Sequence, residues 1–159
     1  MIVCVYIFAL VAANLLVAHF GPSFSLVNAF ILIGLDLSLR DKLHDQWKND
    51  KLVLKMGGLI AVASLVSYLL NPATGQIAIA SLAAFALAML ADALIYQKLI
   101  NKKWFIRANG SNAGGALVDS IVFPTIAFGS LMPAIVLGQF LAKTAGGFVW
   151  SKILSKYHE

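Results

Sequence analysis

Long apolar stretches alternate with short polar connections along the chain. A helix needs about 20 predominantly apolar residues to cross the hydrocarbon core of a membrane. The pattern predicts six spans, at roughly 1–20, 22–39, 54–70, 76–97, 114–131 and 133–153. The turn signals FGPS, NPATG and GSLMP connect spans in pairs, and two longer polar segments connect the pairs to one another. We therefore expect an all-α, polytopic six-helix bundle that forms a single domain over residues 1–159.

Composition places the chain among membrane proteins. Of its 159 residues, 60% are hydrophobic and only 12% are charged, against about a quarter charged in a typical soluble domain. Cys4 is the single cysteine, which excludes an internal disulfide, and no cysteine–histidine pattern indicates a metal site. The first apolar stretch has no basic segment before it, so we interpret it as a retained span and not as a cleaved signal peptide.

The basic residues predict how the bundle is oriented. Cytoplasmic loops of membrane proteins carry an excess of Lys and Arg. The three short connections have none, and all 12 basic residues follow the second span, follow the fourth span or lie in the last span and tail. They are Arg40, Lys42, Lys48, Lys51 and Lys55, then Lys98, Lys102, Lys103 and Arg107, then Lys143, Lys152 and Lys156. We expect both termini in the cytoplasm and a location in the inner (plasma) membrane. A net charge of +5 distributed in this way does not indicate nucleic-acid binding.

Six polar residues within the predicted spans are candidates for a functional site. Ionisable side chains in a membrane are costly and usually belong to a site or a pathway. Three acids and one lysine are expected in the cytoplasmic half of the bundle. On one interpretation the lysine neutralises one acid and locks the helices together, and the surplus acids face water, are protonated or bind a ligand. The six residues are Asn14, Asp36, Asp92, Asp119, Gln139 and Lys143.

The segment VDSIVFP combines an acid with a helix-breaking residue. Pro124 removes the backbone hydrogen bond to the carbonyl of Ser120, one residue after Asp119. Phe123 lies one turn from the acid on the same helix face. The result would be a notch rich in hydrogen-bond acceptors, suited to a flat ligand with N–H donors. A kink that merely shapes the bundle is the alternative, and it stays open whether Asp119 holds the ligand or holds Lys143.

Two further patterns have structural and functional interpretations. Ala80, Ala84 and Ala88 form a stripe of small residues ending at Asp92 and continuing to Tyr96, which predicts close helix packing with Asp92 facing protein. The segment RDKLHDQW is typical of an amphipathic stub anchored at the membrane interface by its tryptophan. Its acids and histidine at 41, 44 and 45 have the spacing of a metal site, but exposed residues of this kind usually face water, and no metal is predicted.

Several segments together resemble the queuosine-precursor transporters of the vitamin uptake transporter (VUT) family. They are AANLLVA with Asn14, GLDLSLRDKL with Asp36, ADALIYQKL with Asp92, VDSIVFPTIAFG with Asp119, Ser120, Phe123 and Phe128, and GQFLAK with Lys143. The resemblance implies a membrane transporter that imports 7-cyano-7-deazaguanine or a related 7-deazaguanine for queuosine salvage in tRNA. Many members have an acid where Arg40 stands here.

The residues and the resemblance together predict a substrate site. Its members are Asn14, Asp92, Tyr96, Asp119, Ser120, Phe123, Gln139 and Lys143, with Asp36 and Arg40 in a secondary role. The predicted partners are a small-molecule base and membrane lipids, with a second copy of the chain as a candidate, and no cofactor or nucleic acid.

Three alternatives remain beside an importer that works alone. The chain is alternatively the substrate-capture subunit of an energy-coupling-factor transporter, and Ala9 and Ala13 give its first span a small-residue face for a partner. An intramembrane enzyme would use paired acids for proton transfer, but the sequence has no nucleophile–base or metal-ligand pattern, and we predict no enzyme activity. A purely structural membrane protein would not need the surplus acids. Proton coupling and facilitated diffusion both remain open.

Overall fold

In a computed structural model of the chain, residues 2–47, 51–102 and 104–155 are described, and they form helices joined by short connections. The helical segments, in chain order, are α1 (Ile2–Phe20), α2 (Phe24–Asn28), the π-helical segment η1 (Ala29–Ile33), α3 (Gly34–Trp47), α4 (Leu52–Leu70), the 3₁₀ turn η2 (Pro72–Thr74), α5 (Gly75–Lys98), α6 (Trp104–Phe128) and α7 (Pro133–Ser155). Because α2, η1 and α3 follow one another without a break, the described chain makes six helical passes, and the all-α prediction is confirmed.

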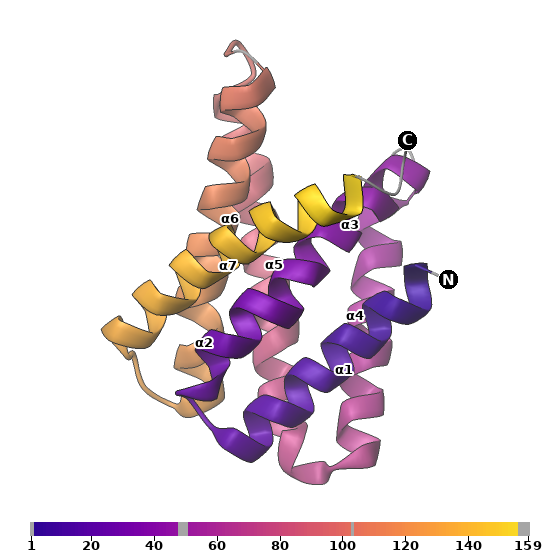
Figure 1. The fold of residues 1–159 in the computed structure, drawn as a ribbon, viewed down its shortest axis with the longest axis vertical. Coiled ribbons are helices and arrows are strands. Elements are labelled where there is room, and N and C mark those ends of the chain that lie inside the picture. The colour runs from indigo at the N-terminus through magenta and orange to yellow at the C-terminus, as the bar shows by residue number, and fades with distance from the viewer. Residues whose placement is uncertain (1, 48–50, 103, 156–159) are drawn as a thin grey trace.

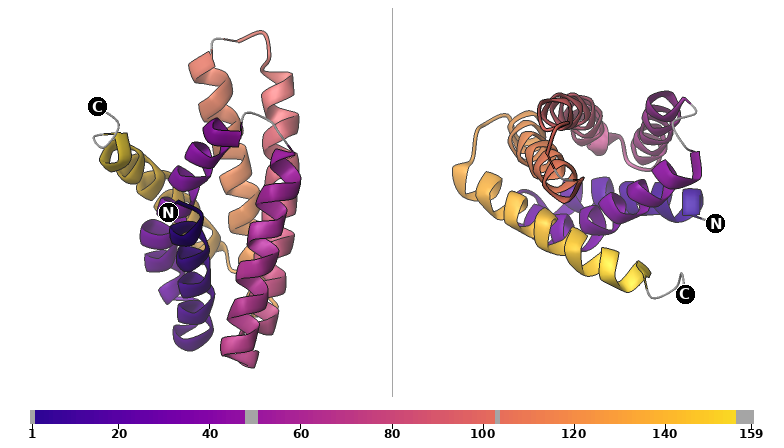
Figure 2. Two further views of the ribbon diagram at one scale, coloured as in Figure 1. Left: turned by 90° about the vertical axis from the view of Figure 1, so that its right-hand side faces the viewer. Right: turned by 90° about the horizontal axis from the view of Figure 1, so that it is seen from above.

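The passes alternate in direction, so the connections gather at two ends (Figures 1 and 2). We call the end that carries the connections at 20–24, 70–75 and 128–133 the short-loop end. Gly21 (φ 76°) and Gly129 (φ 70°) adopt the left-handed conformation that ends a helix, which explains why α1 and α6 end where they do. The second pass ends at the opposite end of the bundle, as does the fourth (Figure 1).

Two helices extend beyond the membrane spans that apolar length predicts. The fifth pass, α6, begins at Trp104 and not near residue 114, and the second pass continues to Trp47 instead of stopping near 39. Both extensions contain several polar residues, and a count of apolar residues predicts which segments fit in lipid, not which segments are helical. A short polar connection with no proline leaves the backbone free to continue its helix when a neighbouring helix packs against it.

The surface of the bundle is apolar and its interior contains many polar groups. Large apolar side chains are well exposed on several passes, including Phe8 (71%), Leu54 (73%) and Leu69 (71%). Asn14 and Gln139 are buried, and so are several other polar side chains. Exposed apolar surface of this extent indicates contact with lipid. The fold and the surface are those of a membrane protein.

The length and composition of individual helices support part of the six-span prediction. Ile2–Phe20 and Pro72–Lys98 are long and apolar enough to cross a membrane. Phe24–Leu39 and Leu54–Leu70 are shorter apolar helices. Since α6 and α7 do not meet the same criterion within the described residues, the crossing of the membrane by all six passes stays a prediction.

Small residues bring neighbouring passes into close contact at two places. Ala80, Ala84 and Ala88 are buried along α5, as the stripe predicted, and α6 lies against them. A Cβ atom added to Gly115 of α6 would lie 3.2 Å from the carbonyl oxygen of Ala88. On α7, a Cβ added to Gly146 would lie 2.2 Å from the carbonyl oxygen of Phe30 in η1. The second contact fixes α7 directly against the π-helical segment.

An apolar cluster fills the bundle toward the short-loop end. Val17 of α1, Ile77 and Ala80 of α5 and Ala127 of α6 are buried against one another. Phe123 is packed on this cluster and also lines the cavity described next. The cluster is therefore the floor of that cavity.

Candidate functional site

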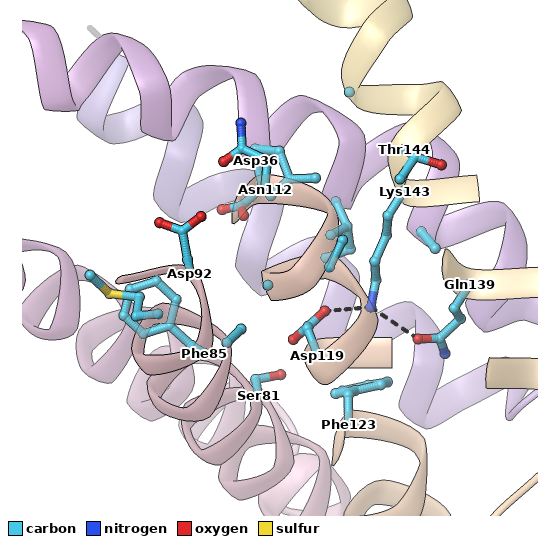
Figure 3. Close-up of a pocket in the computed structure, with 18 of the residues that line it drawn as sticks. Asp36, Ser81, Phe85, Asp92, Asn112, Asp119, Phe123, Gln139, Lys143 and Thr144 are labelled. Carbon is cyan, nitrogen blue, oxygen red and sulfur yellow. Dashed lines mark hydrogen bonds and ion pairs between the residues drawn. The ribbon is translucent and has the colours of Figure 1, made fainter. Parts of the chain in front are cut away.

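A cavity of about 960 Å³ lies among the helices, with wall residues from all six passes (Figure 3). Ligand pockets for small molecules usually measure about 300–1,000 Å³. The walls extend from Asn14, Ser81 and Phe123 near the floor to Tyr96 and Phe148 toward the opposite end of the bundle. A cavity of this size has room for a planar base together with water.

Lys143 organises one wall of the cavity. Its ammonium group forms an ion pair with Asp119 across the contact between α7 and α6, and it donates a second hydrogen bond to Oε1 of Gln139 at 3.1 Å (Figure 3). The amide nitrogen of Gln139 donates to the hydroxyl of Ser25 at 2.9 Å, and that hydroxyl donates to the carbonyl of Pro22. We call Ser25, Asp119, Gln139 and Lys143 the lysine cluster. Charge and hydrogen bonds within it are largely satisfied.

Asp92 lines another wall and differs from Asp119 in its bonding. It comes from α5, four residues after the buried Ala88. Its Oδ1 atom is buried and has no hydrogen-bond partner among the described residues. A buried carboxylate oxygen without a donor is unfavourable, because it has lost the hydrogen bonds that it would make to water. Asp92 is therefore better able than Asp119, which is paired with Lys143, to accept donors from a ligand.

Asn14 and its neighbours connect three helices below this acid. The side chain of Asn14 donates to the hydroxyl of Ser67 on α4 at 3.2 Å and accepts from the hydroxyl of Ser81 on α5 at 2.8 Å. Ser67 in turn donates to the carbonyl of Ala63 at 2.8 Å. Asn14 and Ser81 line the cavity, so this connection fixes its lower part and occupies both polar ends of the Asn14 amide.

Aromatic side chains are distributed along the same cavity. Phe85 and Tyr96 come from α5, Phe123 from α6 and Phe148 from α7. Phe123 also packs edge-on against Phe128, with ring centroids 6.2 Å apart. Faces of such rings can stack on a planar heterocycle, and in the view of Figure 3 Phe85 is drawn next to Asp92 and Phe123 next to Asp119.

Most of the predicted site residues meet at this cavity. Its lining residues include Asn14, Asp36, Asp92, Tyr96, Asp119, Phe123, Gln139 and Lys143. Ser120 does not line the cavity: it is 0% exposed, so the hydroxyl expected in the notch points into the helix packing. The side chain of Arg40 lies outside the described residues. The three predicted acids and the lysine all line this cavity, and Asp36 is 8% exposed.

Sequence reasoning missed several uncharged polar residues of the cavity wall. Ser25, Asn28, Ser81 and Asn112 all line it, and none belonged to the predicted site. Asn28 had a signal that could have been used, since an asparagine in the middle of the apolar run VNAFILIG needs an internal partner as much as an acid does.

The described residues contain no group of three or more His, Cys, Asp or Glu side chains that could hold a metal ion. The sequence also has metal-ligand spacing in the acids and histidine at 41, 44 and 45. Their side chains lie outside the described part of the structure.

The chain was compared with known proteins. A family model described as "Putative vitamin uptake transporter" matches residues 1–154. The chain belongs to this family. No curated protein and no solved structure matches it. Membership in a vitamin uptake transporter family, with the apolar helices and the polar cavity, makes the chain a membrane transporter for a small molecule.

Proposed function

We propose that the chain is a multi-pass importer of the inner membrane for 7-cyano-7-deazaguanine or a related 7-deazaguanine, which the cell uses for queuosine salvage in tRNA. The family supports transport of a small molecule. The identity of the base comes from the sequence resemblance to queuosine-precursor transporters and from the chemistry of the cavity. The distribution of the basic residues supports cytoplasmic termini for the six passes.

Asp92 carries the proposal. A guanine-type base presents two parallel N–H donors, one on the ring and one on the exocyclic amine. A carboxylate accepts two such donors side by side, and charged acceptors make the stronger hydrogen bonds. Asp92 lines the cavity with a buried oxygen that lacks a donor, whereas Asp119 is held by Lys143. We assign the donor edge of the base to Asp92 and a stabilising role to Asp119.

The remaining walls suit the rest of the base. Phe85 and Phe123 offer faces for stacking of the bicyclic ring. Lys143 is 3% exposed and lines the cavity, so its positive charge favours the electron-rich carbonyl or nitrile of a bound deazaguanine. A site with these buried groups rejects bases that leave its acceptors unpaired.

Uptake of radiolabelled 7-cyano-7-deazaguanine tests the proposal in cells that cannot synthesise the base. Cells that produce the chain should accumulate the label, and Asp92→Asn should lower the initial rate about 10- to 100-fold, which corresponds to the loss of a charged hydrogen bond. A protonophore in a parallel measurement separates proton-coupled uptake from facilitated diffusion.

Gln97→Ala is the matched control, because Gln97 is an exposed residue on α5 that does not line the cavity. It should transport as the unaltered chain does. If the unaltered chain accumulates no label although it reaches the membrane, the proposed substrate is wrong. If Asp92→Asn transports normally, the base binds elsewhere in the cavity.

The alternative of a substrate-capture subunit loses its main sequence signal. Ala9 and Ala13, the small residues that would form a docking face on the first span, are 1% and 3% exposed because other helices of the same chain cover them. Uptake in cells without any energy-coupling module would separate the two functions.

A further inference from the structure

Asn28 has another buried acceptor in the cavity wall, on a different helical pass from Asp92 and Asp119. It is the last residue of α2 and is followed directly by η1. The residue lines the cavity and is 5% exposed. Its Oδ1 atom is buried and has no hydrogen-bond partner among the described residues. A buried carbonyl oxygen of this kind requires a physical explanation.

The orientation of the Asn28 amide is determined by α1. Its Nδ2 atom donates to the main-chain carbonyl of Ala13 at 3.3 Å. If the amide were turned over, its oxygen would face another carbonyl oxygen, which repels it. The nitrogen is therefore held toward α1, and Oδ1 is directed away from that helix.

The nearest polar cluster does not provide the missing donor. Ser25 lies one turn before Asn28 on the same helix and receives its hydrogen bond from Gln139. Lys143 donates to Asp119 and to Gln139. These groups satisfy one another, and no hydrogen bond joins any of them to Asn28 in the described structure.

The backbone that follows Asn28 is of a kind often found at functional sites. A π-helical segment contains an extra residue in the helical turn and usually occurs where a wall must be shaped around a site. The oxygen is covered in this structure, so a ligand reaches it when the wall shifts locally. The π-helical segment is the place in this pass where the register of the hydrogen bonds is already altered.

We propose that Oδ1 of Asn28 accepts a hydrogen bond from an N–H group of the transported base and that Asn28 is a specificity-determining residue. This inference rests on the proposed function and adds to it a second contact, on α2, that the acid motifs do not include. Bases that lack the matching N–H would leave the acceptor unpaired and would bind more weakly.

Calorimetric binding to the purified full chain in lipid nanodiscs tests the inference. The probes are 7-cyano-7-deazaguanine, its analogue without the exocyclic amine, and its analogue methylated on the pyrrole N–H, a donor that the Asp92 carboxylate does not use. The unaltered chain should bind at least one analogue about 10-fold more weakly than the parent base. Asn28→Ala should bind the parent about 10-fold more weakly and should distinguish it from that same analogue by less than about 3-fold.

Asn101→Ala is the control, since Asn101 is exposed in the connection after α5 and does not line the cavity. It should keep the full discrimination of the unaltered chain. Asn28→Ser, which retains a small polar side chain, repeats the measurement if the alanine variant does not fold. Equal discrimination by the unaltered chain and the Asn28 variants for both analogues would overturn the inference while leaving the proposed function intact. If the unaltered chain binds none of the three bases, the proposed function fails, and the inference fails with it.

Discussion

The lysine cluster and the two acceptors, Asp92 and Asn28, lie in the walls of one cavity but differ in how their polar groups are satisfied. Lys143 donates hydrogen bonds to Asp119 and Gln139, and Gln139 donates one to Ser25. The polar groups of the cluster therefore satisfy one another. Asp92 and Asn28 each have a buried oxygen without a donor. A closed cluster can stabilise the fold but has little left for a ligand, whereas the open acceptors reduce stability and gain most from one.

This difference leads to opposite expectations for variants. Substitutions in the lysine cluster should lower stability strongly, because each leaves a buried partner unsatisfied. Substitution of Asp92 should affect stability little, and substitutions of both open acceptors should act on binding. The predictions below separate the two regions by stability, from the largest expected loss to the smallest.

Replacing the lysine should have the largest effect. Lys143→Met leaves the Asp119 carboxylate in the cavity wall without its counter-charge. Loss of one member of a buried ion pair costs about 3–5 kcal/mol, and we expect about 3 kcal/mol because a quarter of the Asp119 side chain is exposed to solvent. The free energy of unfolding in mixed micelles measures this loss.

Two further variants are controls for the lysine substitution. Lys102→Met alters an exposed lysine in the connection after α5 and should change the free energy of unfolding by less than about 0.5 kcal/mol. Adding Asp119→Asn to Lys143→Met removes the stranded charge and should recover part of the loss. A double variant that is less stable than Lys143→Met would mean that the ion pair is not what holds this wall.

Filling the glycine contact behind Asn28 should have the next largest effect. In Gly146→Ala the new methyl group would meet the carbonyl oxygen of Phe30 at 2.2 Å, so the backbone of η1 must move. Overpacking of this kind costs about 1–3 kcal/mol. Thermal unfolding measures it, and Gly57→Ala, whose methyl group meets nothing within 4 Å in α4, should be neutral or up to about 1 kcal/mol more stable.

Removing the Gln139 amide, which links Lys143 to Ser25 of α2, should have a moderate effect on stability. Gln139→Leu keeps the approximate side-chain volume but deprives Lys143 of an acceptor and Ser25 of a donor. With Gln139 only 1% exposed, we expect a loss of about 1–3 kcal/mol in the free energy of unfolding. An unchanged stability would show that water replaces both hydrogen bonds and that the cluster is open.

Neutralising Asp92 should have the smallest effect on stability. Asp92→Asn removes the charge of a carboxylate whose Oδ1 atom has no hydrogen-bond donor. The protein without ligand should therefore be as stable as the unaltered chain or slightly more stable. Thermal unfolding without ligand measures this, and unfolding with the base present should show that the stabilisation by ligand is lost. A strong destabilisation of the apo protein would place Asp92 with the closed groups.

Apolar length and the turn signals predicted the number and order of the passes well. Gly21, Gly129 and Pro133 mark boundaries in the sequence that the structure confirms, because their backbone preferences act locally. The helix α6 begins before the predicted span because its first turns include the polar segment RANGSN, which a count of apolar length leaves out and which packs against α5. A contact such as Gly110 with Leu99 between those helices is not visible in the local pattern.

The members of the site were easier to predict than their pairing. Depth along each span indicated that the three acids and the lysine share one region, and they line one cavity. Depth does not say which faces meet, so whether Lys143 would hold Asp119 or Asp92 depended on the rotation of α5, α6 and α7. The burial of Ser120 could not be predicted for the same reason. A helix face that lines a notch and a helix face that packs on a neighbour have the same spacing of residues in the sequence.

The apolar floor of the cavity has a consequence for ions. Protons cross a protein along continuous chains of water and polar groups, and narrow apolar constrictions exclude water. Val17, Ile77 and Ala127 provide no such groups between the cavity and the short-loop end. While this packing persists, the cavity has an apolar barrier toward the short-loop end, which would slow the passage of water and protons through that end.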